Sequence, residues 1–155
     1  MTTSAASRRV SPEIRALLAE VGLDADQVED LVRRAIEEDL DGGVDVTTVA
    51  TVPADQRATF DPVARRPGVV AGVPVAAAVF SFVCGPDADI RLVAADGGRV
   101  SVGDVVLSVH GSTHDLLQAE RPALNLLGHL SGIATLTRTW VDEIAGTSAA
   151  LRDTR

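Results

Sequence analysis

The sequence predicts an α+β fold in which helices at both ends of the chain flank a small antiparallel sheet. Apolar residues recur at helical spacing over residues 11–43 and again beyond residue 112, while residues 45–111 carry short β-like runs between Gly- and Pro-containing turns. The chain has 155 residues, 46% of them apolar, so it is long enough to bury one sizeable core.

Two helices are expected near the start, after a loose tail over residues 1–10. Residues 11–22 begin with Ser-Pro-Glu, which supplies an N-cap, a proline at the first helical position and an acidic first turn, and they end in glycine. Residues 24–43 open on a capping-box-like start and end in Asp-Gly-Gly. The polar face of this second helix, which includes Glu29, is expected to face solvent.

The middle of the chain is expected to form the sheet and one buried helix. That helix covers residues 74–83, within an apolar stretch over 69–85 that is shorter than the about 20 residues of a membrane-spanning helix. We therefore expect buried core rather than a membrane segment. Strands are expected over residues 46–52, 57–64, 69–70, 90–94 and 105–109.

Beyond the sheet the pattern changes again. Residues 116–130, interrupted by Pro122, and residues 133–144 have the periodicity of two helices. Residues 148–155 are expected to form a strand. Because no partner for that strand follows, the sequence indicates a chain cut inside a second unit.

The charged and sulfur-containing residues exclude several classes of function. A net charge of −8 argues against a nucleic-acid partner, which would need a basic surface. All 14 basic residues are arginine, so Schiff-base chemistry and biotin or lipoyl attachment, which need lysine, are excluded. One cysteine, Cys84, excludes an intramolecular disulfide and favours a reducing, cytoplasmic setting. Surface or capping positions, rather than a metal site, are expected for His110, His114 and His129.

Residues 97–111 contain a Val-x-x-Gly-Asp turn that resembles the hammerhead turn of biotinyl and lipoyl carrier domains. Turn chemistry explains this pattern, because Gly103 can supply a positive φ and Asp104 can bond to its local backbone. A carrier domain would need a modifiable lysine. A non-catalytic sandwich module with this turn, used for binding or assembly, is the alternative to the enzymatic interpretation given below.

Two arginines are candidate ligand-binding residues. Arg121 lies on a helix that is otherwise lined by leucine, and Arg155 ends the last expected strand. Arginine binds carboxylate or phosphate through a planar two-point fork, and barrel folds place their chemistry at the carboxyl ends of strands. The alternative is a local ion pair for Arg121 and a frayed terminus for Arg155.

Several sequence blocks resemble one enzyme family. Residues 120–137 contain E-R-x-A-L-N and L-S-G-I-A-T-x-T, which are similar to the signature of carboxylating nicotinate-nucleotide pyrophosphorylase, also called quinolinate phosphoribosyltransferase. The resemblance runs from about residue 25 to the last residue. Further matching blocks are E-D-L at 38–40, D-V-T-T at 45–48, A-D-G at 95–97, V-G-D at 102–104 and R-D-T-R at 152–155.

The resemblance implies an N-terminal α/β sandwich domain over residues 11–112. Linking helices and the first strand of an incomplete, TIM-like α/β barrel would follow over residues 113–155, with the rest of the barrel absent. The implied reaction transfers a phosphoribosyl group from phosphoribosyl pyrophosphate to quinolinate, and it yields nicotinate mononucleotide, pyrophosphate and CO₂ on the de novo route to NAD. The family requires Mg²⁺, and its dimers place one subunit's N-terminal domain over the partner's barrel mouth.

By motif position, the resemblance implies that Arg121 holds a quinolinate carboxylate across the dimer interface, while Thr154 and Arg155 contact quinolinate within the barrel. The family's catalytic residues, and its ligands for phosphoribosyl pyrophosphate and Mg²⁺, lie beyond residue 155. We therefore expect the 155-residue chain to be inactive alone, and to form homodimers or higher oligomers without a membrane or nucleic-acid partner. Pro122 stands where the family usually has another residue after this arginine.

Overall fold

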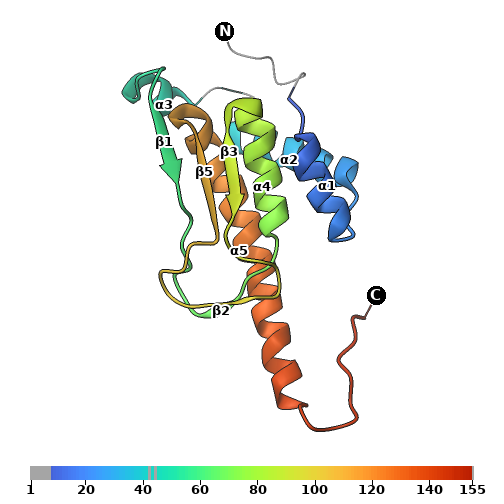
Figure 1. Ribbon diagram of the computed structural model, residues 1–155. Coiled ribbons are helices and arrows are strands. Elements are labelled where there is room, and N and C mark those ends of the chain that lie inside the picture. Colours follow the sequence, from blue (N-terminus) through green and yellow to red (C-terminus); the bar gives the residue numbers. More distant parts are fainter. Residues whose placement is uncertain (1–7, 42, 44, 155) are drawn as a thin grey trace.

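Figure 1 shows the computed structural model of the chain, which describes residues 8–41, 43 and 45–154. Helices precede and follow a central antiparallel sheet, so the prediction of an α+β fold is confirmed. The elements in chain order are α1 (Pro12–Glu20), α2 (Ala25–Leu40), α3 (Val46–Thr51), β1 (Arg57–Phe60), β2 (Gly68–Val69), α4 (Val73–Cys84), the 3₁₀ turn η2 (Gly85–Asp87), β3 (Asp89–Leu92), β4 (Arg99–Val100), β5 (Leu107–Ser112) and α5 (Thr113–Glu143).

The main sheet has three antiparallel strands in the order β1-β5-β3. The central strand β5 pairs with both neighbours, and its Val109 lies opposite Phe60 of β1 and Ile90 of β3. Leu107 and Val109 are buried whereas His110 is exposed, so one face of the sheet covers the core and the other faces solvent. Strands β2 and β4 form a separate two-stranded pair.

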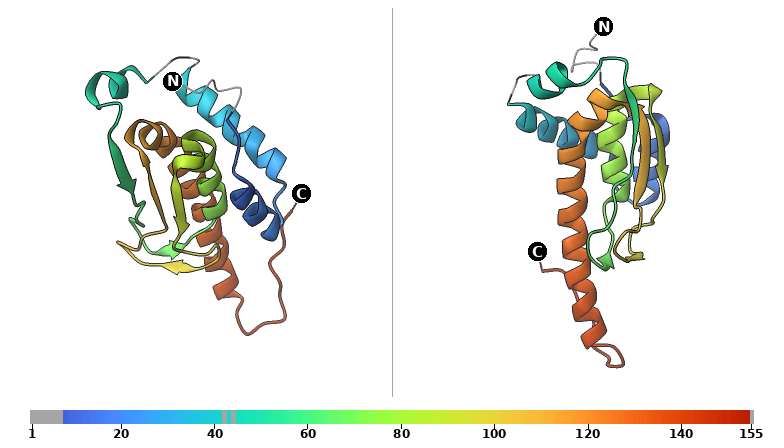
Figure 2. Two further views of the ribbon diagram at one scale, coloured as in Figure 1. Left: turned by 45° about the horizontal axis from the view of Figure 1, so that its top comes forward. Right: turned by 90° about the vertical axis from the view of Figure 1, so that its left-hand side faces the viewer.

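Helix α4 lies at the centre of the core. Its residues from Val73 to Val83 are all buried, because α4 packs against the sheet, against α5 and against both N-terminal helices. Figure 2 shows α4 and α5 on one face of the sheet, with α1 and α2 on the side of α4 away from β1. The expectation of buried core over residues 69–85 is confirmed along α4. Burial raises the pKa of the Cys84 thiol to about 12, so this cysteine stays an inert thiol.

The two N-terminal helices begin where the sequence indicates. The Ser11 side chain accepts a hydrogen bond from the backbone of Ile14, and the Asp24 side chain accepts from the backbone of Asp26 and Gln27. The expectation of a loose tail over residues 1–10 is wrong for Val10, which is buried in the core. Residues 1–7 lie outside the described part of the chain.

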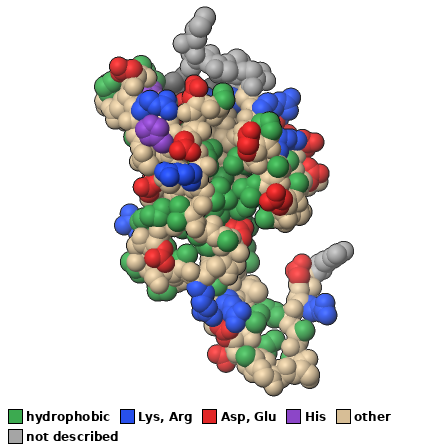
Figure 3. All heavy atoms as spheres, viewed as in Figure 1, with side chains coloured by type: hydrophobic (Ala, Val, Ile, Leu, Met, Phe, Trp, Pro, Cys, Tyr) green, Lys and Arg blue, Asp and Glu red, His purple; other side chains and the backbone are tan. Residues whose placement is uncertain are grey.

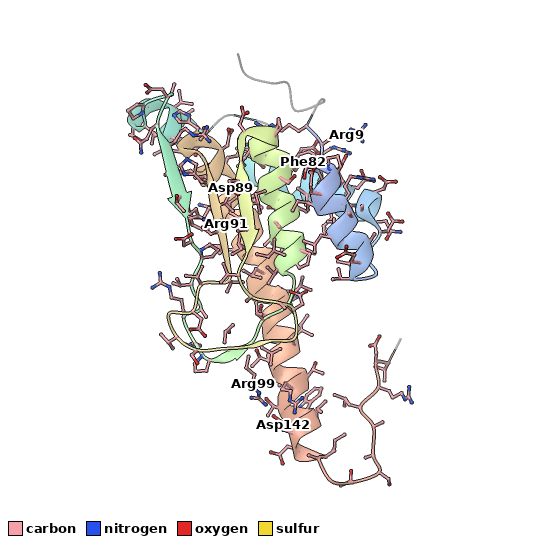
Figure 4. The ribbon with its side chains drawn as sticks, in the orientation of Figure 1. Arg9, Phe82, Asp89, Arg91, Arg99 and Asp142 are labelled. Atoms are coloured by element: carbon pink, nitrogen blue, oxygen red, sulfur yellow. The ribbon has the colours of Figure 1, made fainter. Side chains whose placement is uncertain are left out.

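Glu29 is buried, contrary to the expectation that it faces solvent, and its side chain is only 3% exposed. The carboxylate accepts a hydrogen bond from the backbone N–H of Val10 and forms ion pairs with Arg9, Arg15 and Arg33. Figure 4 labels Arg9, which lies just before α1. A buried charge is tolerated when it is paired and hydrogen-bonded, so these contacts join the chain start, α1 and α2 at one carboxylate.

The expected strand over residues 46–52 is wrong, because this segment forms α3. Asp45 caps the helix: its carboxylate accepts hydrogen bonds from the Thr48 backbone N–H at 3.0 Å and from the Thr48 hydroxyl at 2.5 Å. At the other end, His114 Nε2 lies 2.9 Å from the carbonyl oxygen of Val52. The local cap at Asp45 and the contact from His114 together outweigh the β propensity of the valines and threonines.

The two helices expected beyond residue 112 are one continuous helix, α5. Pro122 removes one backbone hydrogen bond inside it but is itself buried, so its ring packs against the core. The expected strand over residues 148–155 is also wrong for residues 148–154, which are irregular, while Arg155 lies outside the described residues. A strand needs a hydrogen-bonding neighbour, and Figure 1 shows this segment leaving α5 away from the sheet.

Candidate functional site

Helix α5 presents Arg121, the candidate ligand-binding arginine, on its outer side. Ala119 and Ala123, two residues before and after it, are buried against the core. Residues two positions apart lie on nearly opposite sides of a helix, so burial of both alanines turns Arg121 outward. Its side chain is 75% exposed.

Arg121 has one acidic partner in the described part of the chain. Its Nη1 lies 3.5 Å from Oδ1 of Asp39, which stands in the last turn of α2. The sequence left open an ion pair between Arg121 and a neighbouring acid, and such a pair is present, with an acid from another helix. The contact engages one nitrogen of a guanidinium that has five N–H donors, so the fork retains donors for a second acceptor.

Thr154, the second predicted site residue, is exposed in the irregular segment that follows α5. No hydrogen bond or ion pair within the described residues joins it to Arg121, whose partner there is Asp39. Arg155, the third predicted site residue, lies outside the described residues. The structure therefore places one of the three predicted residues on a rigid helix and does not bring Thr154 to it.

Two hydroxyl groups on α5 hold the edge of β2 and the residues that follow it. Thr135 Oγ1 accepts a hydrogen bond from the Val69 N–H at 2.9 Å and donates to the Val69 carbonyl oxygen at 3.3 Å. Four residues earlier, Ser131 Oγ makes the same pair of contacts with Ala71, at 3.0 and 3.2 Å. The spacing between residues four apart on a helix is close to the spacing between residues two apart on an extended segment. The two hydroxyls of α5 therefore satisfy the backbone groups of this segment as a neighbouring strand would.

The same contact leaves little room for side chains on the facing segment. A Cβ atom on Gly68 would lie 2.6 Å from Thr135 Oγ1, and one on Gly72 would lie 2.5 Å from Leu130 Cδ1. Gly72 also has a φ of +88°, which L-residues rarely adopt. A side chain at either position would therefore force Thr135 or Leu130 to shift.

Two cavities lie along α5. One, of about 340 Å³, lies between the end of α2, α3 and the first turns of α5, and Arg8, Arg33, Asp45, His114 and Gln118 are among its lining residues. The other, of about 620 Å³, lies between residues 62–70 and the apolar side of α5. Sequence reasoning gave no signal for either cavity, since each is lined by segments far apart in the chain.

The histidines fill capping and surface roles. His114 caps α3, His110 Nδ1 lies 3.1 Å from the Thr59 hydroxyl, and His129 is exposed. Over residues 8–41, 43 and 45–154, no three His, Cys, Asp or Glu side chains stand close enough together to hold a metal ion.

The family of the chain follows from its match to a family profile. The profile described as quinolinate phosphoribosyl transferase, N-terminal domain, matches residues 45–131, which is more than half of the chain. The chain belongs to this family. The resemblance that the sequence blocks indicated is therefore confirmed.

Individual relatives agree with this assignment. The chain is 48% identical over 131 residues to the nicotinate-nucleotide pyrophosphorylase [carboxylating] of Mycobacterium leprae, a match that covers 84% of this chain and 46% of the relative. It is 35% identical over 125 residues to the chloroplastic enzyme of that name from Arabidopsis thaliana, covering 81% and 35%. The crystal structure of NadC from Streptococcus pyogenes superposes with a TM-score of 0.79 at 34% identity, covering 86% and 47%. The chain thus spans less than half the length of these relatives.

Several blocks that carry the family resemblance have structural roles. Both carboxylate oxygens of Asp96 accept hydrogen bonds at the start of α4, from the backbone N–H of Gly72 at 2.8 Å and of Val73 at 2.9 Å. Gly103 has a φ of +92°, and Asp104 accepts from the Ser101 N–H at 2.7 Å, so the predicted Gly-Asp turn is confirmed. Together with Ser131 and Thr135, these residues give the A-D-G, V-G-D and L-S-G-I-A-T blocks roles in folding.

Charged side chains also fix the far end of α5. Figure 3 shows arginine and acidic side chains gathered over this end, and Figure 4 labels Arg99 and Asp142 there. Asp142 pairs with Arg99 of β4 at 3.1 Å and with Arg138 of its own helix.

In the part of the chain that the structure describes, no helix is both long and apolar enough to cross a bilayer.

Proposed function

We propose that the chain is the N-terminal part of a quinolinate phosphoribosyltransferase, which converts quinolinate and phosphoribosyl pyrophosphate to nicotinate mononucleotide, pyrophosphate and CO₂ in NAD biosynthesis. The observation that carries this proposal is the family match over residues 45–131, which includes Arg121. The exposed fork of Arg121 on a rigid helix supports a role in binding an anionic substrate. The matched relatives have names that describe this reaction.

Quinolinate carries two adjacent carboxylates, which suit arginine forks. In the proposal, Arg121 binds one carboxylate in the active site of a partner copy, while Thr154 and Arg155 of that copy bind the substrate from the other side. The lack of a contact between Thr154 and Arg121 within one chain is compatible with such a shared site. Two-sided binding fixes the orientation of the pyridine ring for attack, and fixed positive charge stabilises the departing pyrophosphate.

Mg²⁺ is part of the proposed reaction, but the described residues do not fit a site for it. They bring no three metal-ligating side chains together, whereas Mg²⁺ needs oxygen ligands in octahedral geometry. We propose that the Mg²⁺ ligands, the phosphoribosyl pyrophosphate site and the catalytic residues belong to the part of the relatives that this chain does not span. The 155-residue chain alone is accordingly expected to form no nicotinate mononucleotide above a no-enzyme blank.

The proposed organisation divides the chain at the start of α5. Residues 11–112 would form the sandwich domain, and residues 113–155 would lead into a barrel domain of a cytoplasmic homodimer or higher homo-oligomer. Three large side chains on the outer half of α5 support coverage by further protein, because each is about half exposed: Ile133, Leu136 and Trp140. Exposed apolar patches of this kind promote association.

Mixing two inactive variants tests the shared site. In a full-length enzyme that contains this chain, Arg121→Ala and Arg155→Ala should each lower kcat/KM for quinolinate at least tenfold, because each removes a charge-assisted hydrogen bond to a carboxylate, an effect of about 1.5–3 kcal/mol. A mixed dimer has one site without either lesion, so an equimolar mixture should recover roughly a quarter of the wild-type activity. If mixed dimers form and activity stays at the level of the single variants, Arg121 does not act in a shared site.

A further inference from the structure

Asp39 occupies an unfavourable position at the end of α2. The last turn of α2 contains Glu37, Glu38 and Asp39 and no basic residue, and Asp41 follows at the C-cap. The C-terminal end of a helix carries a partial negative charge, so carboxylates there destabilise the helix unless a cation compensates them. A carboxylate at this unfavourable end of a helix, with no basic residue nearby in the same helix, suggests that the side chain has a role in contacts outside the helix.

The cation near Asp39 comes from another element. Helix α2 packs against α5, and Arg121 of α5 is the ion-pair partner of Asp39 among the described residues. The two side chains differ in exposure: that of Asp39 is 24% exposed and that of Arg121 is 75% exposed. The carboxylate is therefore held close to the protein surface, while the guanidinium extends from it into solvent.

We propose that Asp39 is a positioning residue that orients the guanidinium of Arg121 for a substrate carboxylate, an inference that rests on the proposed function. The contact at Nη1 restrains a long, flexible side chain and leaves the other nitrogens of the fork free for a two-point contact. Restraint before binding reduces the side-chain entropy that is lost when substrate binds. Asp39 also neutralises part of the positive charge, but solvent screens a single contact of this exposure, so orientation is the larger effect.

Asp39→Asn in a full-length enzyme that contains this chain tests the proposal. We expect the KM for quinolinate to rise about two- to fivefold, the size of effect that exposed ion pairs produce, with kcat changed less than twofold. In an Arg121→Ala background the same substitution should leave KM unchanged within error, because the residue to be positioned is gone. Asp39→Glu should restore part of the wild-type KM. Glu38→Gln, which removes an equal charge from the neighbouring exposed residue, should leave KM unchanged.

Thermal unfolding of the same proteins separates positioning from a structural role. Removing a carboxylate from the C-terminal end of α2 should leave the midpoint of Asp39→Asn equal to or above that of the wild type, while its KM rises. A fall in KM, or an equal rise in the Arg121→Ala background, would overturn the positioning role and leave the proposed function intact. If Arg121→Ala itself leaves the quinolinate KM unchanged, the proposed role of Arg121 fails, and the role of Asp39 fails with it.

Discussion

The double hydrogen bond between Thr135 and Val69 gives the sharpest prediction about stability. Thr135→Val keeps the shape of the side chain and removes only the hydroxyl group. It leaves the N–H and the carbonyl of Val69, which is 7% exposed, without the partners that lie at 2.9 and 3.3 Å. An unsatisfied buried polar group costs about 1–3 kcal/mol, so we expect the free energy of unfolding to fall by about 2 kcal/mol. In a chain of this length, that loss lowers the unfolding midpoint by about 4–8 °C.

Urea unfolding of the 155-residue chain, followed by far-UV circular dichroism, measures this loss directly. The matched control is Thr139→Val, the same substitution one turn further along α5. The Thr139 hydroxyl is exposed and donates only to the carbonyl of Thr135 in its own helix, so its removal should change stability by less than about 0.5 kcal/mol. Equal effects of the two substitutions would show that the hydroxyl of Thr135 does not hold β2.

Three further predictions concern stability. Glu29→Gln removes the charge shared by three arginines and should lower the free energy of unfolding by about 1.5–3 kcal/mol in chemical denaturation. Gly72→Ala adds a Cβ atom 2.5 Å from Leu130 Cδ1, which must move, and should destabilise the chain by about 1 kcal/mol more than Gly97→Ala, where φ is also positive but no atom lies within 4 Å. Hydrogen bonds from Thr48 lower the pKa of Asp45 in the folded chain, so its contribution to α3 is present at neutral pH and should be lost as the pH falls below roughly 4. The pH dependence of the amide NMR resonances of α3 should report that transition. Asp45→Asn, which removes the titrating carboxylate, should weaken the pH dependence.

Local hydrogen-bonding patterns explain most of what the sequence predicted correctly. The caps of α1 and α2 and the Gly-Asp turn at residues 103–104 depend on groups within a few residues of one another, so their residue types suffice to place them. The error at α3 is instructive, because its N-cap is equally local. The D-V-T-T block contains the cap, but the β-branched residues that follow Asp45 favour a strand by intrinsic propensity, and the cap that Asp45 forms with Thr48 outweighs that preference.

Contacts between distant segments explain what the sequence predicted wrongly. Glu29 has the spacing of a surface residue on α2, yet guanidinium groups from three segments enclose its carboxylate. Helix α5 continues through Ser131 and the following glycine, and there the Ser131 hydroxyl accepts a hydrogen bond from the backbone of Ala71, 60 residues earlier in the chain. The segment after α5 has strand-like residues, but no strand among the described residues lies beside it to pair with.

Consecutive residues were enough to predict the α+β class, the buried helix α4 and, through family-specific blocks, Arg121 as a candidate site residue. Those features depend on periodicity, local capping and short motifs, all of which are written in consecutive residues. Three features emerge only in the folded chain: Asp39 meets Arg121, α5 holds the edge of β2, and Glu29 is buried. These pairs are separated by 82, 66 and up to 20 residues along the chain, as the residue numbers and hydrogen bonds show. Packing of whole helices brings them together, and no local pattern encodes that packing.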